Sequence, residues 1–236
     1  MNDTLEAKLK TFNENYFENK EYRAWLNNSN LWLSLYTCLR LRGVEMDKRE
    51  LVDMLNGGIV QDLSINTYNF IHNFKAMFKD MQASVQMKDD LNEKLLLRFC
   101  NILFEEAEYR KTNPIIYKWG YIPPHFTEVS EKIVTTFKKA RTISNPVSKA
   151  YFMHQAICTV YPFSEDTSIV ACIAMYYELL KAGIPLPSFT VDNEDYDKLM
   201  LEYFEHGSKD FKTMFENSLL NRLDSVLVFG FESRER

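Results

Sequence analysis

The segment from residue 161 to residue 172, Tyr-Pro-Phe-Ser-Glu-Asp-Thr-Ser-Ile-Val-Ala-Cys, could form a turn that holds reacting groups. It separates two apolar stretches with helical spacing, 150–160 and 169–180. A turn that opens onto the start of a helix presents free backbone N–H groups, which bind anions such as phosphate. The segment contains carboxylates and hydroxyls but no His, Lys, Arg or Gly. It therefore lacks the histidine that most often serves as general base, a cation and the glycines of a phosphate-binding loop.

The composition predicts an all-α protein. At 236 residues and 46% hydrophobic content the chain can bury one substantial core, and its seven Gly and seven Pro disfavour a β-barrel or sandwich. The net charge of −5, without a basic stripe, argues against nucleic-acid binding. No apolar run is long enough to cross a membrane, and the first ten residues lack the apolar core of a signal peptide. We therefore expect a cytoplasmic protein without nucleic-acid or membrane partners. Widely spaced cysteines within apolar helical patterns, typical of buried free thiols, agree with this: Cys38, Cys100, Cys158 and Cys172.

The apolar spacing predicts a series of helices that position the 161–172 segment. Asn145 and Pro146 suit the start of the helix before it, Thr127 suits an earlier helix start, and Gly43 suits the residue after a helix. We expect a helical extension over residues 1–30 and one domain over 31–236. The predicted helices cover about 3–27, 31–42, 48–55, 65–80, 91–107, 127–141, 145–160, 169–180, 194–206 and 209–224.

Residues 111–124 interrupt the helical pattern. β-branched and aromatic residues lie here between Pro and Gly, which predicts a small β-hairpin. Two interpretations of Tyr117, Trp119 and Tyr121 remain open. Their rings either pack against the domain or form an edge that receives an extended peptide by strand addition.

The order of these elements resembles the Fic family, the Fido-fold transferases named for filamentation induced by cAMP. The family signature, His-Pro-Phe-x-(Asp/Glu)-Gly-Asn-Gly-Arg-x-x-Arg, lies between two helices. Pro162, Phe163 and Glu165 match it, and Tyr161 stands at the His position. The remaining departures are Asp166, Thr167, Ser168 and Ile169 for Gly-Asn-Gly-Arg, and Cys172 for the last Arg, while Ser164 occupies the variable position.

The flanking segments extend the resemblance to roughly residues 31–220. Glu108-Tyr109-Arg110 resembles the family's Gly-x-(Tyr/Phe)-Arg, Tyr121-Ile-Pro-Pro124 resembles its Val-Pro-Pro segment, and His154 matches an upstream His. The resemblance implies a Fic/Fido-like helical bundle with one small β-hairpin, the flap, which aligns the target side chain in active members. The residues placed at the centre of this flap are Ile116, Tyr117, Lys118 and Trp119. His154 is interpreted as a helix histidine with its hydrogen bonds satisfied, or alternatively as a substitute base.

The helix that ends near Gly43 resembles the inhibitory helix, (Ser/Thr)-x-x-x-Glu-(Gly/Asn), of many Fic relatives. In those proteins its Glu pairs with the last Arg of the signature and keeps ATP from binding productively. Here Cys38 stands at the Ser/Thr position and Arg42 at the Glu position, while Cys172 replaces the Arg. The resemblance thus implies that the inhibitory pair is lost at both ends, as expected where no activity remains to be restrained.

Fic enzymes usually transfer AMP from ATP to a target hydroxyl, with the signature His as general base. A tyrosine hydroxyl, with a reference pKa of about 10, is protonated at neutral pH, and losing a positioned base costs about 10²–10⁴ in rate. Thr167 and Ser168 carry side chains where glycines let backbone amides close around phosphates. Ile169 and Cys172 offer no charge to phosphate oxygens. Glu165 alone is a candidate Mg²⁺ ligand, and a weak one.

Three functions remain as hypotheses. The first is a Fic-like domain without transferase activity that binds a protein partner through the flap and the former cleft, or pairs with itself; family habit suggests a homodimer. The alternative is an active transferase of a nucleotide or other phosphate-containing group with a remodelled site, and only then are ATP and Mg²⁺ expected as cofactors. The third is a helical interaction domain unrelated to Fic, which a missing hairpin would favour. A purely structural interpretation also fits the loop, with residues 164–166 as a helix cap, Tyr161 as a partly buried aromatic and Cys172 in the core.

Overall fold

The computed structural model describes residues 3–15, 20–61, 63–114, 118–164, 166–189 and 191–232. These residues form helices joined by short loops, with no strand among them, so the predicted all-α class is confirmed. The helices are α1 (Asp3–Glu14), α2 (Lys20–Leu41), α3 (Lys48–Leu55), α4 (Ile65–Gln86), α5 (Glu93–Phe104), the 3₁₀ helix η1 (Phe126–Glu128), α6 (Val129–Ala140), α7 (Pro146–Val160), α8 (Thr167–Lys181), α9 (Asn193–His206) and α10 (Asp210–Glu232).

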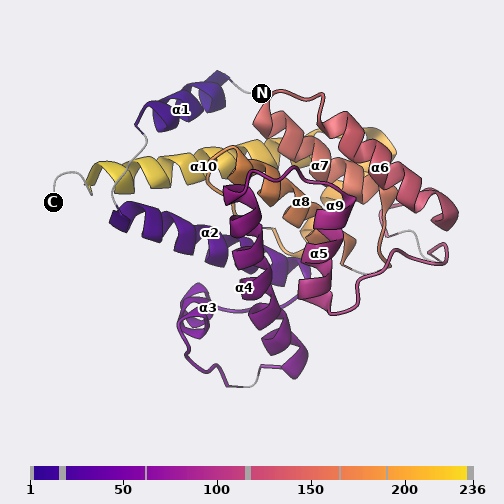
Figure 1. Ribbon diagram of the computed structural model, residues 1–236, viewed down its shortest axis with the longest axis horizontal. Helices are drawn as coiled ribbons and strands as arrows, with labels where there is room; N and C mark the ends of the chain where they lie inside the picture. Colours follow the sequence, from indigo (N-terminus) through magenta and orange to yellow (C-terminus); the bar gives the residue numbers. More distant parts are fainter. Residues whose placement is uncertain are drawn as a thin grey trace.

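Helix α8 lies at the centre of the molecule, and the other helices surround it (Figure 1). Every residue from Thr167 to Leu179 is buried, because this helix is apolar on all sides. Helix α7 packs along α8 as the other arm of a helical hairpin, and α2 and α4 contact further sides of α8. At the far end of the hairpin the buried Glu178 of α8 is neutralised by Lys149 of α7, at 2.8 Å between Oε2 and Nζ. The hairpin thus holds the loop 161–166 at a fixed place in the fold.

Local capping explains where several helices begin and end. The Asn145 side chain accepts a hydrogen bond from the Ser148 backbone N–H, and Pro146 occupies the first turn of α7, as the sequence predicts. Asp47 forms a capping box with Glu50 at the start of α3. Gly43 follows α2 with a φ of +72°, the left-handed conformation expected after a helix.

The first two helices divide differently from the prediction. Instead of helices over 3–27 and 31–42, α1 ends at Glu14 and α2 runs unbroken from Lys20 through the polar stretch 27–30. That stretch remains helical because Ser29 and Asn30 are buried and have partners. The Ser29 hydroxyl donates to the Leu26 carbonyl, and the Asn30 side chain accepts from the Leu186 backbone N–H. Residue 30 therefore lies inside a helix, and the division into an extension and a domain at that residue stays a prediction.

Two other boundaries also differ. Helix α6 is preceded by η1, and Thr127 lies within this turn rather than capping α6. Its hydroxyl pairs instead with Nδ1 of His125, at 2.8 Å. Helices α4 and α10 extend beyond the predicted ends at residues 80 and 224, because continued burial of residues such as Met81 and Val226 favours further turns.

The predicted β-hairpin is not seen among the described residues, and Ile116 and Tyr117 lie outside them. Residues 118–120 form a turn and 121–125 have no regular secondary structure. The segment packs its side chains on α9 rather than pairing with itself: Tyr121 stacks on Phe204 with ring centroids 4.4 Å apart. Gly120 permits this approach, because it has a φ of +63° and an added Cβ would lie 2.4 Å from Glu205 Oε1. We keep the name flap for residues 111–124.

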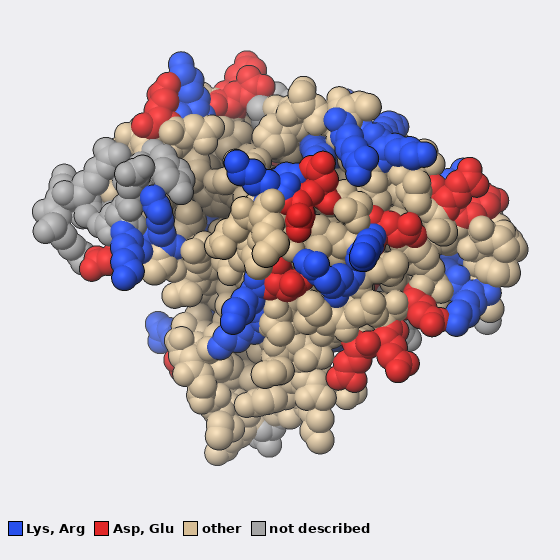
Figure 2. All heavy atoms as spheres, in the orientation of Figure 1, with Lys and Arg blue, Asp and Glu red and all other residues tan. Residues whose placement is uncertain are grey.

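The face shown in Figure 2 carries Lys and Arg side chains interspersed with Asp and Glu, without a broad area of one sign. None of the helices in the described residues combines the length and apolar character that crossing a membrane requires. In the same residues, no group of three or more His, Cys, Asp or Glu side chains is arranged to hold a metal ion.

Candidate functional site

The candidate site is the signature loop, residues 161–168, which joins α7 to α8. Tyr161 ends α7 in the left-handed conformation, with φ 49° and ψ 59°, and Asp166 precedes α8 with φ 54° and ψ 15°. Residues other than glycine rarely adopt this conformation, which costs about 1–2 kcal/mol each. Contacts from neighbouring segments must therefore hold the loop in place.

Arg110 provides most of these contacts. Its side chain is buried, and its Nε donates to the Tyr161 carbonyl at 2.8 Å, while its backbone N–H donates to the Pro162 carbonyl at 2.9 Å. The rest of the guanidinium donates to the flap, through Nη1 to the Thr112 carbonyl and the Asn113 side chain, and through Nη2 to the Pro124 carbonyl. One buried cation thus ties the signature loop to both ends of the flap.

Aromatic packing closes the same region from the flap side. Trp119 is 2% exposed, and its ring meets Tyr161 edge to face at a centroid distance of 5.6 Å. Its Nε1 donates to Asp197 Oδ1 on α9 at 2.9 Å, which fixes the indole between the loop and α9. Phe163 packs on Tyr109, with centroids 5.6 Å apart. Of the two interpretations left open for the flap aromatics, packing therefore holds for Trp119.

The start of α8, where the family carries its glycines, is filled by side chains. Thr167 and Ser168 are buried, and the Thr167 hydroxyl donates to the Phe163 carbonyl at 2.8 Å. Ile169 is fully buried, while Ser164 is exposed. Glu165 lies outside the described residues. The side chains that replace the glycines thus belong to the core and to the helix start.

Asp166 forms an ion pair with Arg42 at the C-terminal end of α2, with 3.4 Å between Oδ1 and Nε. The Arg42 guanidinium also lies over the Phe70 ring, 4.4 Å from its centroid. Both charged side chains are partly exposed, at 31% for Arg42 and 21% for Asp166. The resemblance implied that the pair between this helix and the loop is lost at both ends. That pair involves position 172, which is Cys172 here, whereas the observed ion pair joins Arg42 to Asp166, with the cation on the helix and the carboxylate on the loop.

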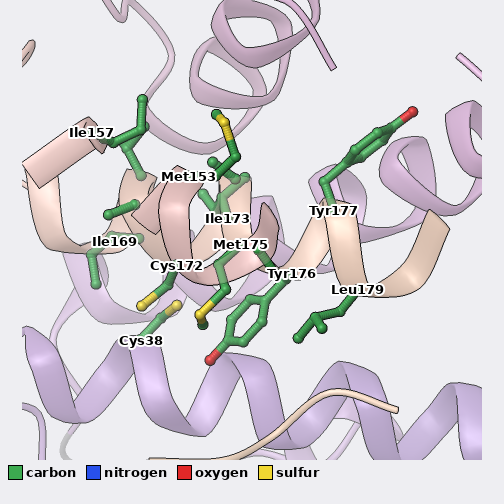
Figure 3. Packing of buried hydrophobic residues seen from close by; sticks show 14 of the residues in the cluster. Cys38, Met153, Ile157, Ile169, Cys172, Ile173, Met175, Tyr176, Tyr177 and Leu179 are labelled. Atoms are coloured by element: carbon green, nitrogen blue, oxygen red, sulfur yellow. The ribbon is translucent and has the colours of Figure 1, made fainter. Parts of the chain in front are cut away.

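Cys38 and Cys172 lie away from the exposed part of the loop. Cys172 points from α8 toward Cys38 on α2, within the buried contact between these helices (Figure 3). Both thiols are free, and burial raises the pKa of each well above its ordinary value. The position of the family's last arginine is therefore occupied by a core side chain.

His154 is enclosed in the core on α7. It is fully buried, it stacks on Phe211 at a centroid distance of 4.3 Å, and its Nε2 pairs with the Tyr196 hydroxyl at 3.1 Å. Its Nδ1 is buried without a hydrogen-bond partner among the described residues, so the expected satisfied histidine is satisfied at Nε2 alone. Burial lowers its pKa to about 3, because the protonated imidazole would be stripped of water. A neutral, enclosed imidazole is arranged for packing rather than for proton transfer at the loop.

Sequence reasoning missed two features of this site. It identified Arg110 only as a marker of resemblance, although the residue hydrogen-bonds both the loop and the flap. It also missed the ion pair between Arg42 and Asp166. The opposite charges at these two positions were the available signal, since the resemblance already placed the helix end beside the loop.

Comparison with known proteins identifies the fold. No protein-family model matches the sequence, and no curated protein matches it significantly. Among solved structures, the chain is similar to a Fic domain containing signaling protein from Bacteroides thetaiotaomicron, with a TM-score of 0.78, 14% identity and coverage of 98% of both chains. It is also similar to Fic-1 from C. elegans, with a TM-score of 0.74, 14% identity and coverage of 98% of this chain and 72% of the other. A Fic family protein from Desulfovibrio desulfuricans gives a TM-score of 0.68 at 12% identity, over 100% of this chain and 76% of the other. At these identities the comparison establishes the fold alone. The fold is that of Fic domains, although the hairpin, whose absence would favour a helical domain of another kind, is not seen among the described residues.

Proposed function

From the Fic-domain fold, we propose that this protein does not transfer AMP and acts as a binding or regulatory module. One observation carries the proposal. The loop that would hold the reacting groups is closed by its own side chains, with Thr167 and Ser168 buried and Tyr161 packed against Trp119. The alternative, an active transferase with a remodelled site, predicts the opposite result in the labelling test described below.

The missing general base supports this proposal. A tyrosine hydroxyl releases its proton near pH 10, so it is a poor acceptor at neutral pH. Tyr161 is held through its backbone by Arg110 and through its ring by Trp119, which leaves it little freedom to reorient. His154, the alternative base, is enclosed by Phe211 and Tyr196.

The described residues also do not fit the phosphates of ATP. Asp166 places a carboxylate at the N-terminal end of α8, where the helix would otherwise attract an anion. Arg42, the cation at the end of α2, is already paired with that carboxylate. Ile169 and Cys172 are buried and uncharged. A triphosphate with Mg²⁺ would therefore meet a negative charge and a filled helix start.

We place the partner contact on the outer side of the flap. Trp119 faces inward, but Ile122 is 69% exposed and Lys118 is also exposed. Exposed apolar and charged side chains on one segment, whose described residues form no strand, suit an extended stretch of another protein or of a second copy. Free, buried cysteines support a reducing compartment such as the cytoplasm.

The transfer reaction can be tested with ATP labelled at the α-phosphate and Mg²⁺, using the purified protein alone and with a cell lysate. We expect no labelled protein, either for the natural chain or for Tyr161→His. The substitution restores a base but leaves the start of α8 filled. Labelling by the natural chain would overturn the proposal. So would stabilisation by a nucleotide and Mg²⁺ that disappears in Glu165→Ala.

The binding surface can be tested with a photo-crosslinking amino acid at Ile122, followed by mass spectrometry of adducts in lysate. The matched control is Ile59, which is 84% exposed on the α3–α4 connection, far along the chain from the flap. We expect specific adducts only at residue 122. Equal adduct patterns at both positions would contradict a binding role for the flap.

A further inference from the structure

A groove of about 710 Å³ lies between α2 and α10, and none of its lining residues belongs to the signature loop or the flap. Its volume falls within the range of about 300–1,000 Å³ typical of small-molecule sites. Indoles, a thioether, neutral polar groups and a single guanidinium make up its principal lining, from Trp25, Trp32, Met214, Asn217, Ser218 and Arg222.

Arg222 is a buried cation without a counter-ion among the residues that the structure describes. It is 7% exposed, and its Nη2 donates to the neutral side chains of Ser29 and Asn30. Its Nε is buried and has no hydrogen-bond partner. Arg222 forms no ion pair within 4.0 Å with a carboxylate of the described residues. Glu216 and Asp224, on the same helix, pair with lysines. Burial lowers the pKa of Arg222 to about 10, so it stays charged at neutral pH. A buried charge of this kind is costly unless it is paired.

Aromatic surface lies next to this cation. The Arg222 guanidinium carbon is 5.3 Å from the centre of a Trp25 ring, and Trp25 stacks on Phe229 with centroids 4.0 Å apart. Trp25 and Trp32 are both half-buried, so part of each indole faces the groove. Stacking and apolar contact here would favour a planar ring.

We propose that this groove binds a small planar aromatic carboxylate, with the carboxylate on Arg222 and the ring against the indoles of Trp25 and Trp32. A guanidinium attracts a carboxylate by charge, and Nε of Arg222 can donate to a carboxylate oxygen while Nη2 keeps its bonds to Ser29 and Asn30. A phosphate monoester fits less well, because it brings nearly two negative charges to one cation and Asp210 also lines the groove. Asn217, which also lines the groove, supplies an amide for hydrogen bonds to substituents of the ring.

The charge requirement can be tested with 2-naphthoate and its neutral counterpart 2-naphthamide as probes. We expect naphthoate to bind at least tenfold more tightly than naphthamide or 2-naphthyl phosphate, as measured by ligand-detected NMR titration. Trp25 and Trp32 account for two of the three tryptophans in the chain, and the third, Trp119, is in the flap. The indole N–H signals of the first two should therefore shift on binding, while that of Trp119 stays unchanged.

Ser218 supplies a variant that tests the role of Arg222 without removing it. It lies one helical turn before Arg222 and lines the groove. In Ser218→Glu the new carboxylate can pair with the guanidinium, so naphthoate binding should fall at least tenfold while thermal stability rises. Ser218→Gln has the same size without the charge and should keep the affinity within about twofold.

Several results would overturn the proposal. These are equal binding of naphthoate and naphthamide, equal affinity in Ser218→Glu and Ser218→Gln, or shifts confined to Trp119. Binding of an acidic peptide in place of naphthoate, with the Trp25 and Trp32 signals shifting, would overturn it in favour of a protein ligand.

Discussion

Removing the Arg110 side chain should release the signature loop from the flap and destabilise the protein strongly. In Arg110→Met, four oxygens lose the guanidinium as their donor, on Tyr161, Thr112, Asn113 and Pro124. Leaving a buried acceptor unsatisfied costs about 1–3 kcal/mol, and partial access of water to this edge of the fold reduces the sum. We therefore expect the free energy of unfolding to fall by about 3–5 kcal/mol, a large share of the stability of a typical domain.

Chemical denaturation with guanidinium chloride measures this loss, and the slope of the transition should stay unchanged because the same surface unfolds. In thermal unfolding, the loss corresponds to a fall in Tm of about 6–20 °C for a chain of this length. Arg110→Lys keeps the charge, but one ammonium cannot hydrogen-bond both the loop and the flap. The free energy of unfolding should therefore fall by about half as much as in Arg110→Met. The control is Arg98→Met. The Arg98 side chain is half exposed and pairs with Asp80, so its removal should lower the free energy of unfolding by no more than about 1 kcal/mol.

Two results would refute the role given to Arg110. One is a loss below 1 kcal/mol in Arg110→Met, and the other is an equal loss in Arg110→Met and Arg98→Met. Limited proteolysis offers an independent measurement. If Arg110 holds the loop and the flap together, the variant should be cut within residues 111–124 or 161–166 at protease concentrations that leave the natural chain intact.

Three further predictions concern single groups. Burial lowers the pKa of His154 to about 3, below the value near 6.5 in the unfolded chain. The stability that His154 contributes is therefore full above pH 6.5 and falls as the pH drops toward 3, because the unfolded chain binds the proton first. Denaturation curves should show a loss of about 2 kcal/mol between pH 6.5 and 5, and His154→Phe should remove this pH dependence. A double-mutant cycle with Arg42→Gln and Asp166→Asn should give a coupling free energy of about 0.2–1 kcal/mol that shrinks in high salt. A coupling free energy that salt leaves unchanged would contradict a partly exposed ion pair. The buried cysteines, with Cys38 and Cys172 face to face, should resist a thiol reagent until the protein unfolds, and rapid native labelling followed by mass spectrometry would disprove this.

The helices could be predicted closely where apolar spacing and local capping agree. Helix α3 begins and ends at the predicted residues, and Asn145 and Gly43 act as the sequence indicates. Prediction failed where tertiary contacts override local preference. The polar stretch 27–30 stays helical because partners on the 186–188 segment and on α10 satisfy Ser29 and Asn30. The flap does not pair with itself in the described residues because its aromatic side chains gain more by packing on α9.

The sequence by itself determined the helical class and the residue types of the segment 161–172, because residue types and 3.6-residue periodicity are local properties. It also determined that the loop has neither a histidine nor glycines. Only the tertiary structure decided what the replacing side chains do. Arg110 reaches the loop from 51 residues away along the chain, and Arg42 reaches Asp166 from the end of another helix. The unpaired charge of Arg222 likewise depends on which carboxylates folding brings near it, and no local pattern encodes that outcome.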